Sequence, residues 1–522
     1  MVFLELTLGL LAACVAFAVL ARRTRVPYAA ILVVGGMALA FVPGLPRPEL
    51  DPALVLALFL PPLLQASAWR TDWKEFRFSL RPILLLAVGC VVFTAACVAG
   101  VVKLVLPDLP WAAALALGAV VAPPDAVAAA SVLSRLPLPH RMVTVLEGES
   151  LLNDASAIVL FRLAVGALAI GSLSPALAAL QFLLVALGGL VVGFGVAWLC
   201  TLVLPRLSDT ALEIAVSFLS AYLAFLAAEA VHASGVIAVV VNGIILARRQ
   251  HVLLPPRTRL SAVATWGFVE FVLTGLVFLL VGLQLNGILE RLEEYGTPFL
   301  LGAAAAVGAT LIVARFAWVF PATYLPRLIP AIRRRDGTPT PREVTVIAWA
   351  GMRGVVSLAV ALSLPLDVPD RDLLIFLAFA AILVTLVVQG TTLEGLIRRL
   401  GVAQRREPGM SRREATARRA MAHAEVGELE SRLDSPLDGA IARDLVGEYR
   451  ERSRVFSGVA GGGTQAELRA RLQLRLAVLR TARTRLLHHH AEEVLPEEML
   501  ARLVEETDHE ELRLVQQLEQ TG

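Results

Sequence analysis

The feature that most constrains this chain is a series of long apolar stretches that recurs from the N-terminus to about residue 400. A helix that crosses about 30 Å of hydrocarbon needs roughly 20 apolar residues. Hydrophobic residues make up 57% of the 522 residues and charged residues only 17%, which excludes an ordinary soluble chain. The sequence therefore predicts an all-α polytopic membrane protein. We count 13 candidate spans, which cover residues 3–20, 28–42, 53–68, 83–106, 111–133, 142–170, 177–204, 211–230, 233–246, 262–285, 298–320, 344–364 and 373–397.

The basic residues of the connecting loops predict the orientation of these spans. Odd-numbered loops carry 19 lysine and arginine residues, and even-numbered loops carry three. Because basic loops remain in the cytoplasm, we expect the N-terminus outside and the C-terminus inside the cell. A wrong number of spans would break this alternation, so the charge pattern also supports a count of 13.

Composition excludes several other classes of protein. The formal net charge is only +3, which does not indicate a nucleic-acid partner. The four cysteines lie in apolar stretches without CxxC spacing, so neither a disulfide framework nor a zinc site is indicated, and no cofactor is expected. These cysteines are Cys14, Cys90, Cys97 and Cys200.

A change in composition near residue 401 predicts two domains. Residues 1–400 contain all the candidate spans, whereas residues 401–522 are rich in arginine and glutamate and contain none. Periodic apolar positions predict helices in this second region. We expect a helical cytoplasmic tail, and the sequence leaves open whether it stabilises a dimer or regulates the membrane domain.

The fifth span contains a helix break beside an acidic residue. Pro123 and Pro124 remove two amide donors and clash with preceding carbonyls, and Asp125 follows them. Irregular backbone at membrane depth occurs only where protein or a water-filled cavity surrounds it. Secondary transporters build cation sites from such broken helices. We therefore predict a cation site at Asp125; a kink in which Asp125 caps the next half-helix is the alternative, and both roles can coexist.

The sixth span carries several oxygen-bearing side chains on adjacent faces. Ser150 and Asp154 are four residues apart and therefore share one face of a helix, while Glu149 and Asn153 form a neighbouring stripe. A hard monovalent cation prefers oxygen ligands, so this region is a candidate transport site. Acids that merely favour a helix N-terminus are the alternative. That explanation suits Glu147 but not Asp154, which lies about two turns further in.

The twelfth span contains an arginine, Arg353, which lies between the two glycines Gly351 and Gly354. A buried arginine is tolerable when it is paired with an acid or with open carbonyls, and glycine permits close backbone approach. We predict that Glu149 is the acidic partner of Arg353. Asp154 is the rival partner, and its pairing with Arg353 would abolish the ion site.

These motifs and three others resemble the bacterial sodium/proton exchanger branch of the monovalent cation:proton antiporters. The similarity covers the whole membrane part in order. It rests on Gly-Glu-Ser-Leu-Leu-Asn-Asp-Ala-Ser-Ala-Ile-Val-Leu-Phe at 148–161, Gly-Met-Arg-Gly-Val-Val-Ser-Leu-Ala at 351–359, Leu-Pro-Pro-Leu-Leu at 60–64, Ser-Gly-Val-Ile-Ala-Val-Val-Val at 234–241 and Leu-Val-Gly-Leu-Gln-Leu at 280–285.

The resemblance implies a homodimer in a bacterial cell membrane, with a core domain that moves like an elevator against a dimerisation domain. Its core would contain two crossing broken helices from inverted repeats, interrupted at Pro123–Pro124 and at Gly351–Gly354. Glu149 and Arg353 would form a structural ion pair. The substrates would be Na⁺, with K⁺ or Li⁺ as alternatives, and H⁺.

The resemblance also implies a role for each polar residue of the sixth span. Asp154 would hold a cation or a proton in turn, with Ser150 and Asp125 as further ligands of the transported metal ion. Asn153 would brace the broken backbone. An asparagine directly before this aspartate implies electroneutral one-for-one exchange.

Two positions depart from the family pattern. Members commonly have Ala-Pro-Thr-Asp-Pro, whereas this chain has Pro124 in place of the threonine and Ala126 in place of the last proline. Many members place an acid where this chain has Gln65. The lost hydroxyl and carboxylate bear on cation affinity and selectivity rather than on the fold.

Exchange requires only one shared carboxylate. If Asp154 is neutralised by either a cation or a proton, and only neutral states cross, the gradient of one ion drives the other. A K⁺/H⁺ antiporter of the same fold is the nearest alternative. A cation channel would not need the Glu149–Arg353 pair. An intramembrane hydrolase built on Ser150 lacks a buried histidine base, so the sequence does not predict an enzyme.

Overall fold

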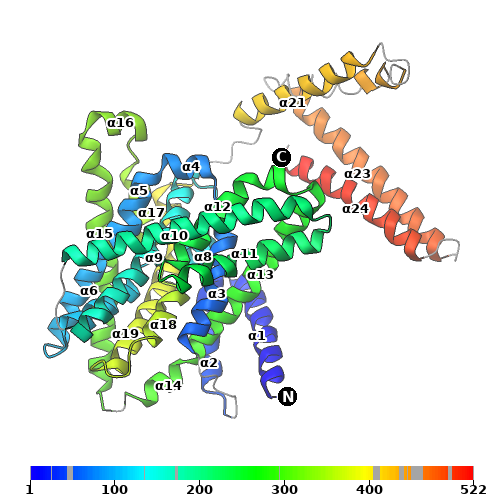
Figure 1. Ribbon diagram of the computed structural model, residues 1–522. Coiled ribbons are helices and arrows are strands. Elements are labelled where there is room, and N and C mark those ends of the chain that lie inside the picture. Colours follow the sequence, from blue (N-terminus) through cyan, green and yellow to red (C-terminus); the bar gives the residue numbers. More distant parts are fainter. Residues whose placement is uncertain are drawn as a thin grey trace. The chain divides into compact units, whose positions relative to one another are not determined.

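The computed structural model describes most of the chain, and every regular element in its described part is a helix (Figure 1). The chain forms two compact units, Met1–Gln404 and Arg405–Gly522. The described residues are 2–24, 26–43, 51–133, 136–170, 175–292, 294–403, 412–433, 440–443, 445–447, 462–491 and 497–520.

All 13 predicted spans lie on helices of the first unit. Among the described residues, ten helices are long and apolar enough to cross a membrane, and two more are shorter. The bounds are α1 (Val2–Thr24), α2 (Tyr28–Ala40), α3 (Pro52–Arg70), α4 (Trp73–Phe78), α5 (Leu80–Leu84), η1 (Leu85–Cys90), α6 (Val91–Val105), α7 (Trp111–Val121), α8 (Ala126–Leu133), α9 (His140–Ile170), α10 (Pro175–Val203), η2 (Leu204–Arg206), α11 (Thr210–Ala230), α12 (Gly235–Leu253), α13 (Pro256–Leu283), α14 (Leu285–Glu290), α15 (Thr297–Tyr324), η3 (Pro326–Leu328), α16 (Pro330–Asp336), α17 (Pro341–Trp349), α18 (Val355–Leu362), α19 (Arg371–Val384), η4 (Thr385–Gln389) and α20 (Gly390–Leu400).

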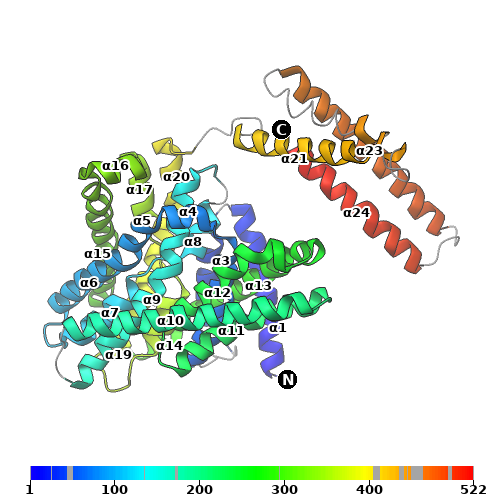
Figure 2. The same cartoon turned by 45° about the horizontal axis from the view of Figure 1, so that its top comes forward.

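One group of helices consists of α1–α3 and α10–α13, which pack on one another (Figure 2). Small residues allow two of these contacts to be very close. A Cβ at Gly193 of α10 would overlap the Ala238 backbone of α12, and a Cβ at Gly282 of α13 would overlap the Val33 carbonyl of α2. Close backbone approach at small residues is the usual way in which membrane helices associate.

The second group consists of α6–α9 and α15–α20, and it contains both interrupted helices. α7 packs on α6, α9, α18 and α19, so it lies at the centre of this group. Two short π-helices, η1 and η4, interrupt otherwise α-helical spans. π-Helical turns often occur at functional sites, because they redirect side chains and free backbone groups.

The second unit contains three described helices, α21 (Arg412–Ser431), α23 (Gly462–Ala491) and α24 (Glu497–Gln520). α23 packs against α24, and the side chains of Arg480 and Glu511 form an ion pair of 2.9 Å between them. The helices predicted in this region are therefore observed as α21, α23 and α24.

Candidate functional site

The two helix breaks predicted from the sequence meet inside the second group. α7 ends at Val121 and α8 starts at Ala126, while α17 ends at Trp349 and α18 starts at Val355. The backbone N–H of Asp125 donates to the Met352 carbonyl at 2.7 Å, so the two interruptions are hydrogen-bonded to each other. Four half-helix ends therefore converge at one point.

Glycine at position 354 is required by this convergence. A Cβ on Gly354 would overlap the carboxylate of Asp125. The two breaks can approach this closely only because position 354 lacks a side chain.

Arg353 bonds to the carbonyls that the first break leaves open. Its guanidinium donates to Val121 O at 2.8 Å and Ala122 O at 3.2 Å, and also to Gly351 O. The last carbonyls of a helix have no partner within that helix and carry partial negative charge. A cation at the end of α7 therefore stabilises the interruption.

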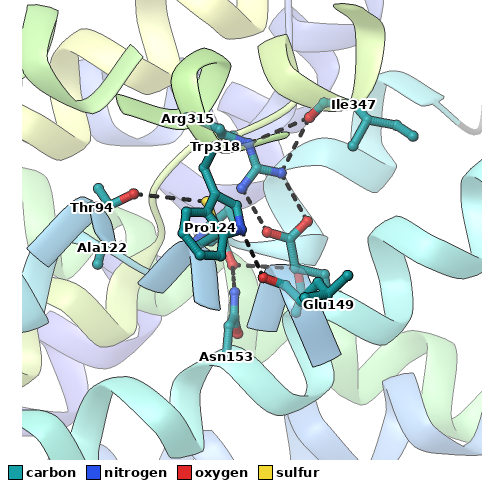
Figure 3. A network of polar contacts seen from close by, with 12 residues as sticks. Thr94, Ala122, Pro124, Glu149, Asn153, Arg315, Trp318 and Ile347 are labelled. Atoms are coloured by element: carbon teal, nitrogen blue, oxygen red, sulfur yellow. Dashed lines mark hydrogen bonds and ion pairs between the residues drawn. The ribbon is translucent and has the colours of Figure 1, made fainter. Parts of the chain in front are cut away.

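The predicted ion pair between Glu149 and Arg353 is wrong. Glu149 instead pairs with Arg315 of α15, with Nη1–Oε1 at 2.6 Å and Nη2–Oε2 at 2.8 Å (Figure 3). Both side chains are only 1% exposed. The reason is that the Arg353 guanidinium is occupied by backbone carbonyls, and Arg315, which also donates to the Ile347 carbonyl, faces Glu149.

Two side chains of α9 bond to the broken backbone of the fifth span. Asn153 Nδ2 donates to the Pro124 carbonyl at 2.6 Å (Figure 3). The Ser150 hydroxyl donates to the same oxygen at 3.3 Å. Asn153 Oδ1 is buried and has no hydrogen-bond partner among the described residues. The break is thus connected to the helix that carries Asp154.

The candidate ion site is a cavity of about 60 Å³ beside these contacts. Asp125, Ser150 and Asp154 line it together, as expected, and the rest of its wall is mainly apolar. Its volume suffices for a cation and water, because one water requires only about 10–15 Å³. Among the described residues, Asp154 has no ion-pair partner.

Sequence reasoning missed three contributors to this region. Thr274 of α13 lines the cavity with a buried hydroxyl that has no partner among the described residues, and Ser67 of α3 lines it as well. Arg315 was also missed. A lone arginine in the apolar stretch 298–320 could have indicated a buried acidic partner.

Gln65 does not line the cavity but joins a buried polar network on α3, α11 and α12. Its Nε2 donates to Ser220 Oγ at 3.3 Å, and its Oε1 accepts from Asn242 Nδ2 at 3.2 Å. Asn242 also donates to Ser220 Oγ at 2.9 Å. The amide of Gln65 therefore connects the three helices α3, α11 and α12.

The apolar bundle, the two hydrogen-bonded helix breaks and the carboxylates beside them define a secondary transporter for small cations. The sequence profile of the family described as sodium/hydrogen exchanger, transmembrane, matches residues 9–399. The chain belongs to this family, whose members are transporters rather than enzymes.

Named relatives and a solved structure agree with this assignment. The chain is 33% identical to the uncharacterized Na⁺/H⁺ exchanger Rv2287 of Mycobacterium tuberculosis, over 98% of this chain and 96% of that protein. It is 33% identical to the Na⁺/H⁺ antiporter ApNhaP of Aphanothece halophytica, over 79% and 77%. The sodium proton antiporter MjNhaP1 of Methanocaldococcus jannaschii has the same fold, with a TM-score of 0.60 at 19% identity, over 77% of this chain and all of that one.

Proposed function

We propose that this exchanger moves Na⁺ against H⁺ by letting the two ions compete for Asp154. Cation/proton exchange is the activity of its family, and relatives such as ApNhaP are named Na⁺/H⁺ antiporters. The observation that carries the proposal is the position of Asp154. It lines a cavity with Asp125 and Ser150, and Arg315 and Arg353, the arginines buried in the described part of the core, bond to other groups.

Competition follows from the cost of charge inside a membrane protein. An uncompensated carboxylate at mid-bilayer is unfavourable by about 2.5–3.5 kcal/mol on insertion scales. Movement of the core across the membrane is therefore unfavourable while Asp154 is ionised. A bound cation or a bound proton neutralises the charge and allows the movement. Each movement of the core then carries either a cation or a proton. The steeper of the two ion gradients therefore drives the other ion against its own gradient.

Asp125 and Ser150 are proposed as accessory ligands of the transported cation. The backbone of Asp125 is fixed by its bond to Met352, and the Ser150 hydroxyl stands against the Pro124 carbonyl. A cation in the cavity would find carboxylate, hydroxyl and carbonyl oxygens, which are the ligands that hard cations prefer. We propose the hydroxyl of Thr274, which also lines the cavity, as a further ligand.

One-for-one exchange is proposed because the residue before Asp154 is an asparagine. Asn153 does not titrate, and its amide donates to Pro124. With Asp154 as the carboxylate that gains and loses the proton, one monovalent ion is bound per transit. Reconstituted protein should show no change in exchange rate when a membrane potential is imposed; a rate that follows the potential would refute electroneutrality.

The test is proton flux in proteoliposomes, measured with an internal pH dye while Na⁺, Li⁺ or K⁺ is added outside. Asp154→Asn should abolish cation-driven proton movement, because an amide cannot exchange a proton for a cation. Glu229→Gln is the matched control, since it removes a carboxylate that pairs with Arg162 away from the cavity. Retained exchange in Asp154→Asn, or equal loss in the control, would refute the assignment.

The same experiment addresses cation selectivity. We propose Na⁺ as the principal cation, in keeping with the names of the relatives. A larger flux with K⁺ than with Na⁺ at equal concentration would instead identify a K⁺/H⁺ antiporter of this fold.

The assembly and orientation are also proposals. The resemblance supports a homodimer in a bacterial cell membrane, with α1–α3 and α10–α13 forming the dimerisation domain. The excess of basic residues in odd-numbered loops supports a cytoplasmic C-terminus and a cytoplasmic tail. Native mass spectrometry in detergent tests the dimer, and a reporter fused after Gly522 tests the orientation.

A further inference from the structure

A cluster of arginines surrounds a second cavity, which the ion site does not use. This cavity of about 270 Å³ lies among η1, the start of α9, the end of α15 and the loop that follows α16. Arg141, Arg327 and Asp336 line it, and the rest of its wall includes apolar side chains such as Val145, Val319 and Ile347.

Three guanidinium groups converge on one short segment here. Arg81 Nη1 forms an ion pair of 2.9 Å with the Asp336 carboxylate. Arg141 donates to the Asp336 backbone carbonyl, and Arg327 Nε donates to the Gly337 carbonyl at 2.8 Å. Two of the three cations therefore bond to neutral carbonyls rather than to acids.

Positive charge in this region exceeds the negative charge that faces it. Asp336 is engaged by Arg81, and Glu343, the other carboxylate of the cavity wall, accepts from the Thr340 N–H at the start of α17. Arg141 Nη2 is buried and has no hydrogen-bond partner among the described residues. Because a buried unpaired donor is unfavourable, the site is suited to an anion.

An open groove of about 680 Å³ adjoins this cavity, and both are lined by Leu85 and Asp336. The groove contains Arg77, Arg81 and Arg335 together with apolar side chains. Among these, Phe78, Leu80 and Leu84 are between 39% and 43% exposed. The arginine-lined cavity thus lies next to a groove whose wall is partly apolar.

The Phe78 ring contacts two arginines, one that lines the cavity and one that lines the groove. The Arg141 and Arg335 guanidinium carbons lie 5.6 Å and 5.9 Å from the centre of its ring. These cation–π contacts orient the guanidinium groups without neutralising their charge.

We propose that this site binds an anionic phospholipid, with the phosphate at the arginines and an acyl chain along Leu84 and Val88. Bidentate guanidinium groups suit phosphate oxygens, and an apolar groove suits a hydrocarbon chain. A free phosphate would use the arginines but leave the groove empty. The lipid would contact η1, α9 and α15. Two of these helices also carry the buried ion pair, since Glu149 is on α9 and Arg315 is on α15.

The experiment uses the delipidated full-length chain in a zwitterionic detergent. Binding of short-chain phosphatidylglycerol is measured by isothermal titration and compared with phosphatidylcholine of the same chain length, glycerol phosphate and inorganic phosphate. Phosphatidylglycerol should bind at least about tenfold more tightly than each of the other three, because only it supplies both an anion and chains.

Single substitutions locate the site. Arg141→Gln and Arg335→Gln should each weaken phosphatidylglycerol binding about fivefold. Arg333→Gln, on the same α16 segment but outside both cavity walls, should change it less than twofold. Arg335 is exposed, so its substitution tests the site even where Arg141→Gln impairs folding.

Three results would overturn the proposal. Phosphatidylcholine that binds as tightly as phosphatidylglycerol would show that the groove binds acyl chains without selecting for an anionic headgroup. Binding of inorganic phosphate as tight as that of phosphatidylglycerol would identify a free-phosphate site instead. Arg141→Gln and Arg335→Gln variants that bind like Arg333→Gln would place the lipid elsewhere.

Discussion

The ion pair between Glu149 and Arg315 should be among the largest single contributions to the stability of the core. Each side chain is 1% exposed, and the two contacts of 2.6 Å and 2.8 Å are bidentate. Removing one partner leaves a buried charge without compensation, which costs about 3–5 kcal/mol. Arg315→Gln and Glu149→Gln should each lower the free energy of unfolding by about this amount.

A surface pair provides the matched control. Arg162 and Glu229 also form an ion pair at 2.8 Å, but their side chains are 48% and 33% exposed. Exposed pairs contribute about 0–1 kcal/mol. Arg162→Gln should therefore change stability little. Unfolding of the detergent-solubilised protein can be followed by tryptophan fluorescence during thermal and SDS titrations.

A double-mutant cycle separates the observed pairing from the one predicted from the sequence. The Glu149→Gln/Arg315→Gln double variant should lose less stability than the sum of its single variants, by about 2 kcal/mol. The corresponding Glu149/Arg353 coupling should be clearly smaller, because Arg353 bonds to backbone carbonyls. A larger coupling to Arg353, or an Arg315→Gln variant no less stable than Arg162→Gln, would refute the reasoning.

Three further predictions address other regions. Gly354→Ala places a Cβ against the Asp125 carboxylate, so cation-driven proton flux should fall to background in proteoliposomes while stability falls by about 1–3 kcal/mol. Gln65→Leu leaves its buried network unpaired and should cost about 1–3 kcal/mol in SDS titrations, with the fold retained. The hydrogen bond from Tyr295 to Asp370 raises the pKa of Tyr295 to about 12. The hydrogen bond should therefore stabilise the fold fully below about pH 10, and this stabilisation should disappear as the pH approaches 12. Tyr295→Phe should accordingly lower the melting temperature at about pH 8 but not near pH 12.

The sequence predicted those parts of the core that depend on local covalent chemistry. Pro123 and Pro124 remove two amide donors, and with Asp125 directly after them they predicted the break that is observed between α7 and α8, whereas α3 continues through Pro61 and Pro62. Ser150 and Asp154 share one helix face because their spacing is four, and both line the cavity. No tertiary contact had to be known for either prediction.

The partner of Glu149 could not be predicted in the same way. Arg315 and Arg353 both lie in apolar spans, and each is more than 160 positions from Glu149. The choice depends on where the end of α7 points, because its open carbonyls bind Arg353. That geometry exists only after the two broken helices have crossed. Local sequence therefore identified the acid but not its counter-ion.

The observed arginine contacts decide whether Asp154 can serve as an exchange site. An arginine bound to Asp154 would neutralise it permanently, and neither a cation nor a proton would be needed for the core to move. Arg315 is bidentate to Glu149, and Arg353 is held by the carbonyls of Val121, Ala122 and Gly351. In the proposed mechanism, the charge that neutralises Asp154 therefore comes from an ion in the cavity. Because Asp154 carries only one charge, occupancy by a cation would exclude a proton and the reverse, and the two gradients would be coupled.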